Sequence, residues 1–196
     1  MTTTDFNIQS LGNLNPAATE VNNTFFNSGT GTRMDAYFRQ LLEEIEKGVK
    51  AEVFEALDYY RTKLDGRKDV EEKLADGGFR PSKIREAQRL KEMYAKLAFQ
   101  YDCYPSAQKI FHSLFARIKH EFDTSIFPLI EQKQPLNTVM EQIRLKIVIP
   151  IRDMLETNGA YDKYMGLNED HIYGMIYYLT GMCHLNWKDY DDDDNL

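Results

Sequence analysis

The stretch HIYGMIYYLTGMCHLNW, residues 171–187, decides the fold of this chain. From Ile172 to Trp187 it contains no Asp, Glu, Lys or Arg, although it holds a Cys, a His, two Gly and three Tyr. Apolar residues recur at helical spacing on more than one side, so apolar surface surrounds much of the helix axis. This pattern is typical of a helix at the centre of a domain or in an interface.

The two glycines of this stretch indicate close packing. Gly174 and Gly181 are seven residues apart and nearly aligned, and each costs about 1 kcal/mol relative to Ala inside a helix. We therefore expect another backbone to approach closely along this line. Core packing is the favoured interpretation for most of the stretch, and its aromatic residues are also candidate partner anchors. The candidate partner-binding residues are Tyr173, Gly174, Tyr177, Tyr178 and Trp187.

Helical spacing continues through most of the chain. Glycine and proline residues, together with Asn168 as a candidate N-cap, divide it into segments. We expect helices over about 34–45, 49–57, 68–75, 81–101, 105–131 with a kink or division at Pro128, 136–156 with an internal Pro150, and 168–187. The sequence predicts an all-α fold, a single multi-helix domain of five to seven helices with short connections.

The two ends of the chain differ from the helical region. Residues 1–32 are rich in Asn, Thr, Ser and Gly, and we expect a polar arm or linker. The composition of this arm is also compatible with a short β-hairpin. Residues 33–188 form the predicted helical domain. Residues 189–196 form an acidic run, which we expect to be solvated and disordered.

Composition and charge exclude several classes of protein. The chain has 196 residues, enough for one domain, and its 24 basic and 31 acidic residues give a net charge of −7. This charge argues against broad affinity for phosphate backbones. The N-terminus lacks a secretory signal and the longest apolar stretch is shorter than a membrane span, so we expect a cytoplasmic protein without membrane contact.

Reactive side chains show no converging pattern. Cys183 and His184 are adjacent and point about 100° apart on a helix, whereas His112 and His120 lie about 12 Å apart along one helix. No metal, cofactor or catalytic residue is therefore predicted, and no nucleophile or phosphate-loop motif is present. A hydrolase with an unrecognised site, such as one using Cys103 or His112, is a less favoured alternative.

One basic cluster could contact nucleic acid. It comprises Arg80, Lys83, Arg85, Arg89 and Lys91, interrupted by Glu86. A solvated face opposite the apolar stripe is the favoured interpretation. The alternative is a nucleic-acid-binding regulator that uses this 80–91 patch.

Several segments together resemble a known family. They are KLADGGF (73–79), SAQKIFHSLFARI (106–118), FPLIEQ (127–132), IPIRDMLETNG (149–159) and above all residues 171–187. Over about residues 35–190 the chain resembles the C-terminal helical domains of bacterial ABC-three-component conflict systems. Tyr173, Gly174, Tyr177, Tyr178, Cys183, His184 and Trp187 form the most distinctive block.

The resemblance implies a role in protein interaction. Such domains accompany effectors, often nucleases, beside a coiled-coil ABC ATPase of the SMC type and a small middle component. The implied function is a non-catalytic adaptor in antiviral defence that docks or restrains the effector until invading DNA is sensed. Because no effector domain precedes the helical region, we expect the effector to be another polypeptide, or this chain to have a different role. Indirect nucleic-acid contact and a homo-oligomer are left open.

Overall fold

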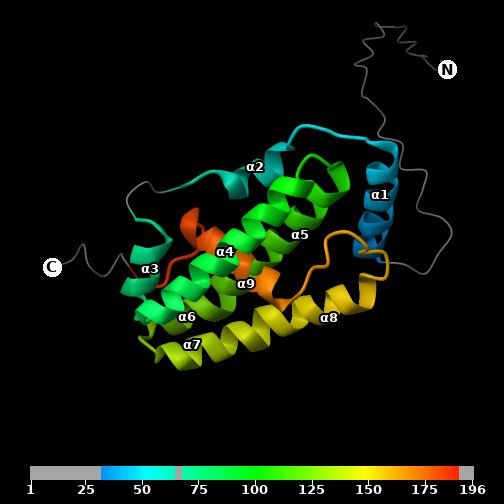
Figure 1. Ribbon diagram of the computed structural model, residues 1–196. Helices are drawn as coiled ribbons and strands as arrows, with labels where there is room; N and C mark the ends of the chain where they lie inside the picture. Colours follow the sequence, from blue (N-terminus) through cyan, green and yellow to red (C-terminus); the bar gives the residue numbers. More distant parts are fainter. Residues whose placement is uncertain (1–31, 65–67, 190–196) are drawn as a thin grey trace, which may run out of the picture. The chain divides into compact units, whose positions relative to one another are not determined.

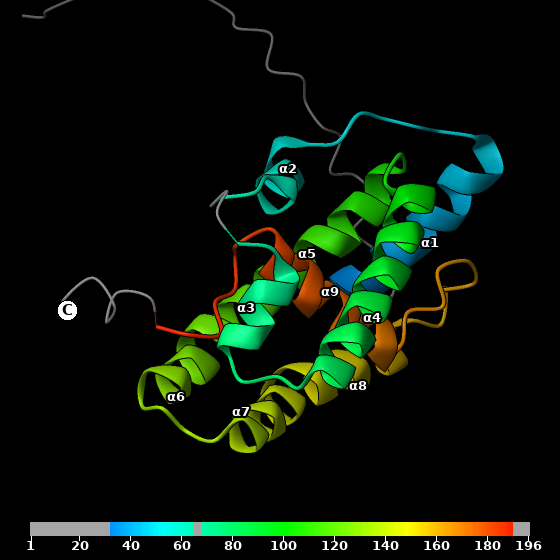
Figure 2. The same ribbon diagram turned by 60° about the vertical axis from the view of Figure 1, so that its left-hand side comes forward.

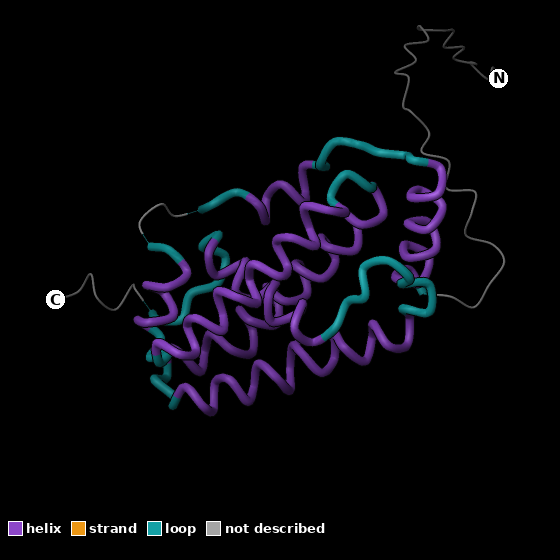
Figure 3. Tube along the Cα trace, viewed as in Figure 1, coloured by secondary structure: helices purple, strands orange, loops and turns teal. Residues whose placement is uncertain are grey.

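All secondary structure in the described residues is helical (Figures 1 and 3). The computed structural model describes residues 32–64 and 68–189. The α-helical segments are α1 (Arg33–Lys47), α2 (Glu55–Arg61), α3 (Val70–Asp76), α4 (Pro81–Tyr101), α5 (Pro105–Glu121), α6 (Phe127–Glu131), α7 (Leu136–Ile143), α8 (Ile149–Asn158) and α9 (Glu169–Gly181). The predicted arm and hairpin before Thr32 and the acidic run from residue 190 lie outside the described residues.

Two π-helical turns join neighbouring segments. One (Phe122–Ile126) connects α5 to α6, and the other (Arg144–Val148) connects α7 to α8, so the nine segments of the described chain form seven continuous helices. The all-α prediction is confirmed. Each following segment has a proline at its second position, which supplies no N–H. The preceding N–H groups bond five residues back, from Phe127 to Phe122 and from Ile149 to Arg144. The predicted proline sites therefore mark π-turns within continuous helices.

Residues 49–54 are not helical, and the predicted helix from Val49 is wrong there. Helix α1 ends at Gly48, whose φ of 66° is left-handed, and α2 begins only at Glu55. Between them the Ala51 N–H donates to the Cys103 carbonyl at 2.8 Å. The buried Gln108 amide accepts from the Phe54 N–H at 3.1 Å and donates to the Glu52 carbonyl at 3.0 Å. These long-range bonds replace the helical ones that the local pattern predicts.

Helix α9 runs beside α4 in the interior of the bundle (Figures 1 and 2). The predicted close backbone approach occurs at Gly174, where an added Cβ would lie 2.5 Å from the Leu90 carbonyl oxygen. It does not occur at Gly181, whose nearest neighbour is the flexible Lys91 side chain. Residues 171–187 therefore form part of the hydrophobic core, as the sequence predicts. Their fully buried members are Ile172, Met175, Ile176, Leu179 and Leu185.

The ends of α9 show two kinds of cap. At its start the Asn168 side chain accepts from the His171 N–H, as the sequence predicts. At its end Cys183 has a left-handed φ of 64°, the Cys183 N–H donates to Thr180 and the His184 N–H donates to Leu179. This pattern is a Schellman cap. The helix therefore ends at Gly181, before the expected limit of Trp187, because the chain turns back over its own last turn.

Candidate partner-binding groove

A groove of about 750 Å³ opens between α4, α7 and α9. Its apolar wall consists of Phe79, Leu90, Leu136 and Met140. Phe79 and Leu90 also belong to the hydrophobic core, whereas Leu136 and Met140 are partly buried and four residues apart on α7. Because residues four apart face the same side of a helix, α7 presents both side chains to this space.

Two predicted partner residues, Tyr173 and Tyr177, line the groove from α9. Their rings stack with centroids 6.5 Å apart. Tyr173 is half-buried and Tyr177 is 6% exposed. Burial raises the pKa of both hydroxyls, so each is protonated at neutral pH and can donate as well as accept a hydrogen bond.

Four charged side chains also line the groove, Arg80, Lys83, Glu86 and Asp170. Lys83 pairs with Glu86 across 2.7 Å on the surface of α4. In the described part of the chain, neither Arg80 nor Asp170 forms an ion pair. Arg80 is the residue directly before α4, and Asp170 lies in the first turn of α9. The groove thus joins members of both predicted sets, the partner-binding and the nucleic-acid-binding residues.

The other predicted partner residues pack inside the fold. Tyr178 stacks on Phe115 with centroids 5.7 Å apart and meets Tyr94 edge-on at 5.3 Å. Trp187 is 4% exposed, and its Nε1 donates to the Thr180 Oγ1 at 2.9 Å. Together with Gly174, these residues contribute to core packing, and a direct role in partner binding stays a prediction for them.

Three residues of the basic cluster lie away from the groove lining. Arg85 and Arg89 are exposed one turn apart on α4, and neither forms an ion pair within residues 32–64 and 68–189. Lys91 is partly buried, with its stem beside Gly181. The cluster is therefore divided between a groove end at Arg80 and an outward pair at Arg85 and Arg89.

Cys183 and His184 are both buried at the end of α9. The His184 ring packs against Tyr59 and Tyr60, and no hydrogen-bond partner for either ring nitrogen lies among the described residues. His112 packs against Phe54 and the same Tyr60 ring. Among residues 32–64 and 68–189, no three His, Cys, Asp or Glu side chains are arranged to hold a metal ion. These contacts give Cys183 and His184 a structural role in ending the helix and filling the core.

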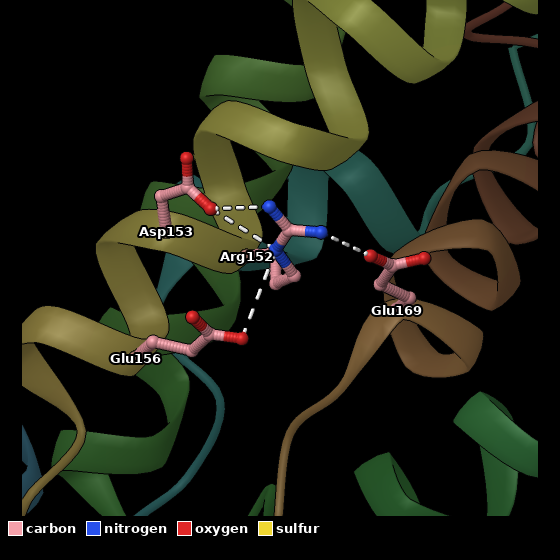
Figure 4. Close-up of polar contacts among 4 residues, drawn as sticks. All are labelled: Arg152, Asp153, Glu156 and Glu169. Carbon is pink, nitrogen blue, oxygen red and sulfur yellow. Dashed lines mark hydrogen bonds and ion pairs between the residues drawn. The ribbon is translucent and has the colours of Figure 1, made fainter.

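Three carboxylates lie around one cation near the start of α9 (Figure 4). Arg152 on α8 contacts Asp153 at 2.7 Å, Glu156 at 3.7 Å and Glu169 at 2.8 Å. The hydrogen bonds to Asp153 and Glu169 raise the pKa of the Arg152 guanidinium. Because the bond to Glu169 joins α8 to the first turn of α9, this cluster acts as a link between helices.

Sequence reasoning missed several residues of the groove, chiefly Phe79, Leu136, Met140 and Asp170. The spacing of Leu136 and Met140 marks one apolar face of α7, which is the only local signal. Which neighbour that face meets depends on how α7 packs beside α4 and α9.

The described part of the chain contains no helix with the length and apolar character that a membrane crossing requires. The fold and the groove define a helical domain with an open, partly apolar surface. A model of the family described as C-terminal domain 9 of the ABC-three component systems matches residues 69–187, more than half of the chain, and the protein belongs to this family. Helices α1 and α2 precede the match, which therefore begins later than the expected residue 35. Searches of curated proteins and of solved structures found no match.

Proposed function

We propose that this chain is a non-catalytic protein-interaction component of a bacterial ABC-three-component antiphage system. It acts in the cytoplasm, where it docks or restrains an effector, a nuclease, with an SMC-like ABC ATPase. Family membership supports the setting in such a system. The observation that supports docking is the open groove, which apolar side chains and two protonated tyrosines line and which no element of the described chain covers.

Affinity purification tests this proposal. A tagged chain, expressed at its endogenous level in the native host and washed at low salt, should recover an ATPase component and an effector. The retained proteins should have their own activities without this chain, because it contributes binding and no chemistry. Recovery of the chain alone would count strongly against docking.

A second candidate function, nucleic-acid binding, is favoured by the outward pair Arg85 and Arg89. Both guanidinium groups are exposed and unpaired within the described residues, so they can contact phosphates. Fluorescence anisotropy with single- and double-stranded oligonucleotides should then show binding that weakens with salt and is abolished by combined Arg85→Glu and Arg89→Glu. Unaltered affinity in that double variant would remove this candidate.

A further inference from the structure

We infer that the groove binds one amphipathic α-helix of a partner protein, with an acidic C-terminal end over Arg80 and its N-terminal end beside Asp170. This inference rests on the proposed docking function and specifies the chemistry of the bound segment. It follows from the direction of the groove, its apolar wall and the charges at its two ends.

The packing of α4 against α9 defines the two ends of the groove. Gly174 lies against Leu90, and the Glu86 carboxylate is close enough to Tyr177 to contribute to its raised pKa. Increasing residue numbers on α9 therefore correspond to decreasing numbers on α4, and the two helices run antiparallel. Arg80 precedes Leu90 by ten residues, about 15 Å along the helix, whereas Asp170 lies beyond Gly174 in the other direction.

The apolar wall suits a helix better than a compact ligand. Phe79 directly precedes Arg80 at one end of the groove, and Leu90 and the two tyrosines lie farther along it toward Asp170. Leu136 and Met140 line the groove from α7. The space is an open groove rather than an enclosed cavity. The stretch of α4 from Arg80 to Leu90 that lines it is about as long as three helical turns. A helix that lies in such a groove presents apolar side chains at intervals of three and four residues.

The charges at the two ends set the expected direction of the bound helix. The start of α4 has no acidic residue in its first turn and no side-chain cap, so the positive end of its dipole adds to the charge of Arg80. Lys83 is paired with Glu86, so among the described residues that line the groove Arg80 is the cation without an ion pair, and a partner carboxylate can pair with it. At the other end, Asp170 favours the positive N-terminal end of a bound helix.

Photo-crosslinking in the native host tests the identity of the bound segment. A photoreactive phenylalanine analogue is placed at Tyr173, which is only half-buried, and at Phe99 as a control, because Phe99 is 85% exposed on the same bundle outside the groove. We expect position 173 to crosslink to a protein partner at sites three or four residues apart within a helix. Position 99 should not crosslink to that helix.

A charge exchange tests the direction. Arg80→Glu should lower the affinity of the purified complex about tenfold or more, and replacement of the opposing partner carboxylate by Lys should restore it. Lys96→Glu, at an exposed position of the same helix outside the groove lining, should leave the affinity unchanged. Circular dichroism verifies that both variants keep the helical fold.

Each other outcome rejects the inference. Crosslinks from position 173 to a second copy of this chain, to its own residues, to a nucleic acid or to a small molecule would identify a different occupant. Equal affinities of Arg80→Glu and Lys96→Glu would remove the charge assignment. If partner proteins still co-purify with the unchanged protein in those cases, the docking function stands. If no partner is retained by the unchanged protein, the docking function and this inference fail together.

Discussion

Gly174 sets the distance between α4 and α9. A Cβ at this position would lie 2.5 Å from the Leu90 carbonyl oxygen and 2.8 Å from the Tyr94 Cβ, neither of which is the end of a flexible side chain. Gly174→Ala should therefore destabilise the fold by about 1–3 kcal/mol, although alanine favours a helix more than glycine does. Urea unfolding, followed through the single Trp187, measures this loss.

Gly181 provides the matched control on the same helix. An added Cβ there would meet the Cε of Lys91 at 3.4 Å, and this flexible side chain can move. Gly181→Ala should leave the free energy of unfolding within about 1 kcal/mol of the unchanged protein. Equal losses in both variants would show that helix propensity or local flexibility, rather than close backbone packing, explains the glycines.

His184 makes stability depend on pH. Burial lowers the pKa of its imidazole below the ordinary 6.5, the positive charges of Lys119 and Lys73 act in the same direction, and the backbone of Tyr59 and Thr62 partly opposes them. The folded protein thus holds His184 neutral where the unfolded chain already binds a proton. The resulting stability is fully present above about pH 6.5 and is lost as the pH falls through the folded-state pKa.

Replacement of His184 by phenylalanine tests this pH dependence. Denaturant unfolding from pH 7.5 to 5 should show a smaller loss of stability for His184→Phe than for the unchanged protein. His120 is exposed, and His120→Gln should preserve the original slope. If His184→Phe keeps the full loss, another group is responsible for the acid sensitivity.

At the scale of elements, α5 is capped by α1. The Ser106 N–H and Oγ donate to the Glu44 carboxylate at 2.9 and 2.7 Å, which satisfies donors at the start of α5 and places a negative charge near its positive end. Because these charge-assisted bonds also join two helices, Glu44→Ala should destabilise the fold by about 1–2 kcal/mol. Thermal unfolding followed by circular dichroism measures the change.

Replacement of the neighbouring Glu43 tests whether the loss of any carboxylate from α1 lowers the stability equally. Its partner is Lys47 on the same helix, and both side chains are largely exposed. Glu43→Ala should change stability by about 0.5 kcal/mol or less. A comparable loss in Glu43→Ala and Glu44→Ala would contradict a specific cap on α5.

At the scale of the whole molecule, α1 belongs to the core although it precedes the family match. Phe38 is 1% exposed and Leu41 is 2% exposed, and α1 packs along α5. Phe38→Ala should destabilise the fold by about 3–5 kcal/mol because it leaves a cavity in this contact. Denaturant unfolding of the full chain measures it.

Phe99→Ala is the control, since the same substitution at an 85% exposed site removes little buried surface. It should change the free energy of unfolding by about 0.5 kcal/mol or less. A small effect of Phe38→Ala would mean that α1 is dispensable and that the family-matched region folds without it.

The sequence predicts features that depend on neighbouring residues better than features that depend on residues far away in the chain. The Asn168 cap acts within a few residues, and this prediction is confirmed. Residues 49–54 were predicted to be helical because their apolar spacing is local information. Their non-helical structure depends on hydrogen bonds to Cys103 and Gln108, about fifty residues away, which no local pattern reveals.

The sequence by itself determined the all-α fold and the buried character of α9, because hydrophobic periodicity and the absence of charged residues leave that helix no face for water. The resemblance in its core segments also indicated the correct family. Only the tertiary structure decided which tyrosines face inward and which line the groove. That division depends on the packing of α4 and α7 around α9, since a helix apolar on most sides has no preferred face of its own.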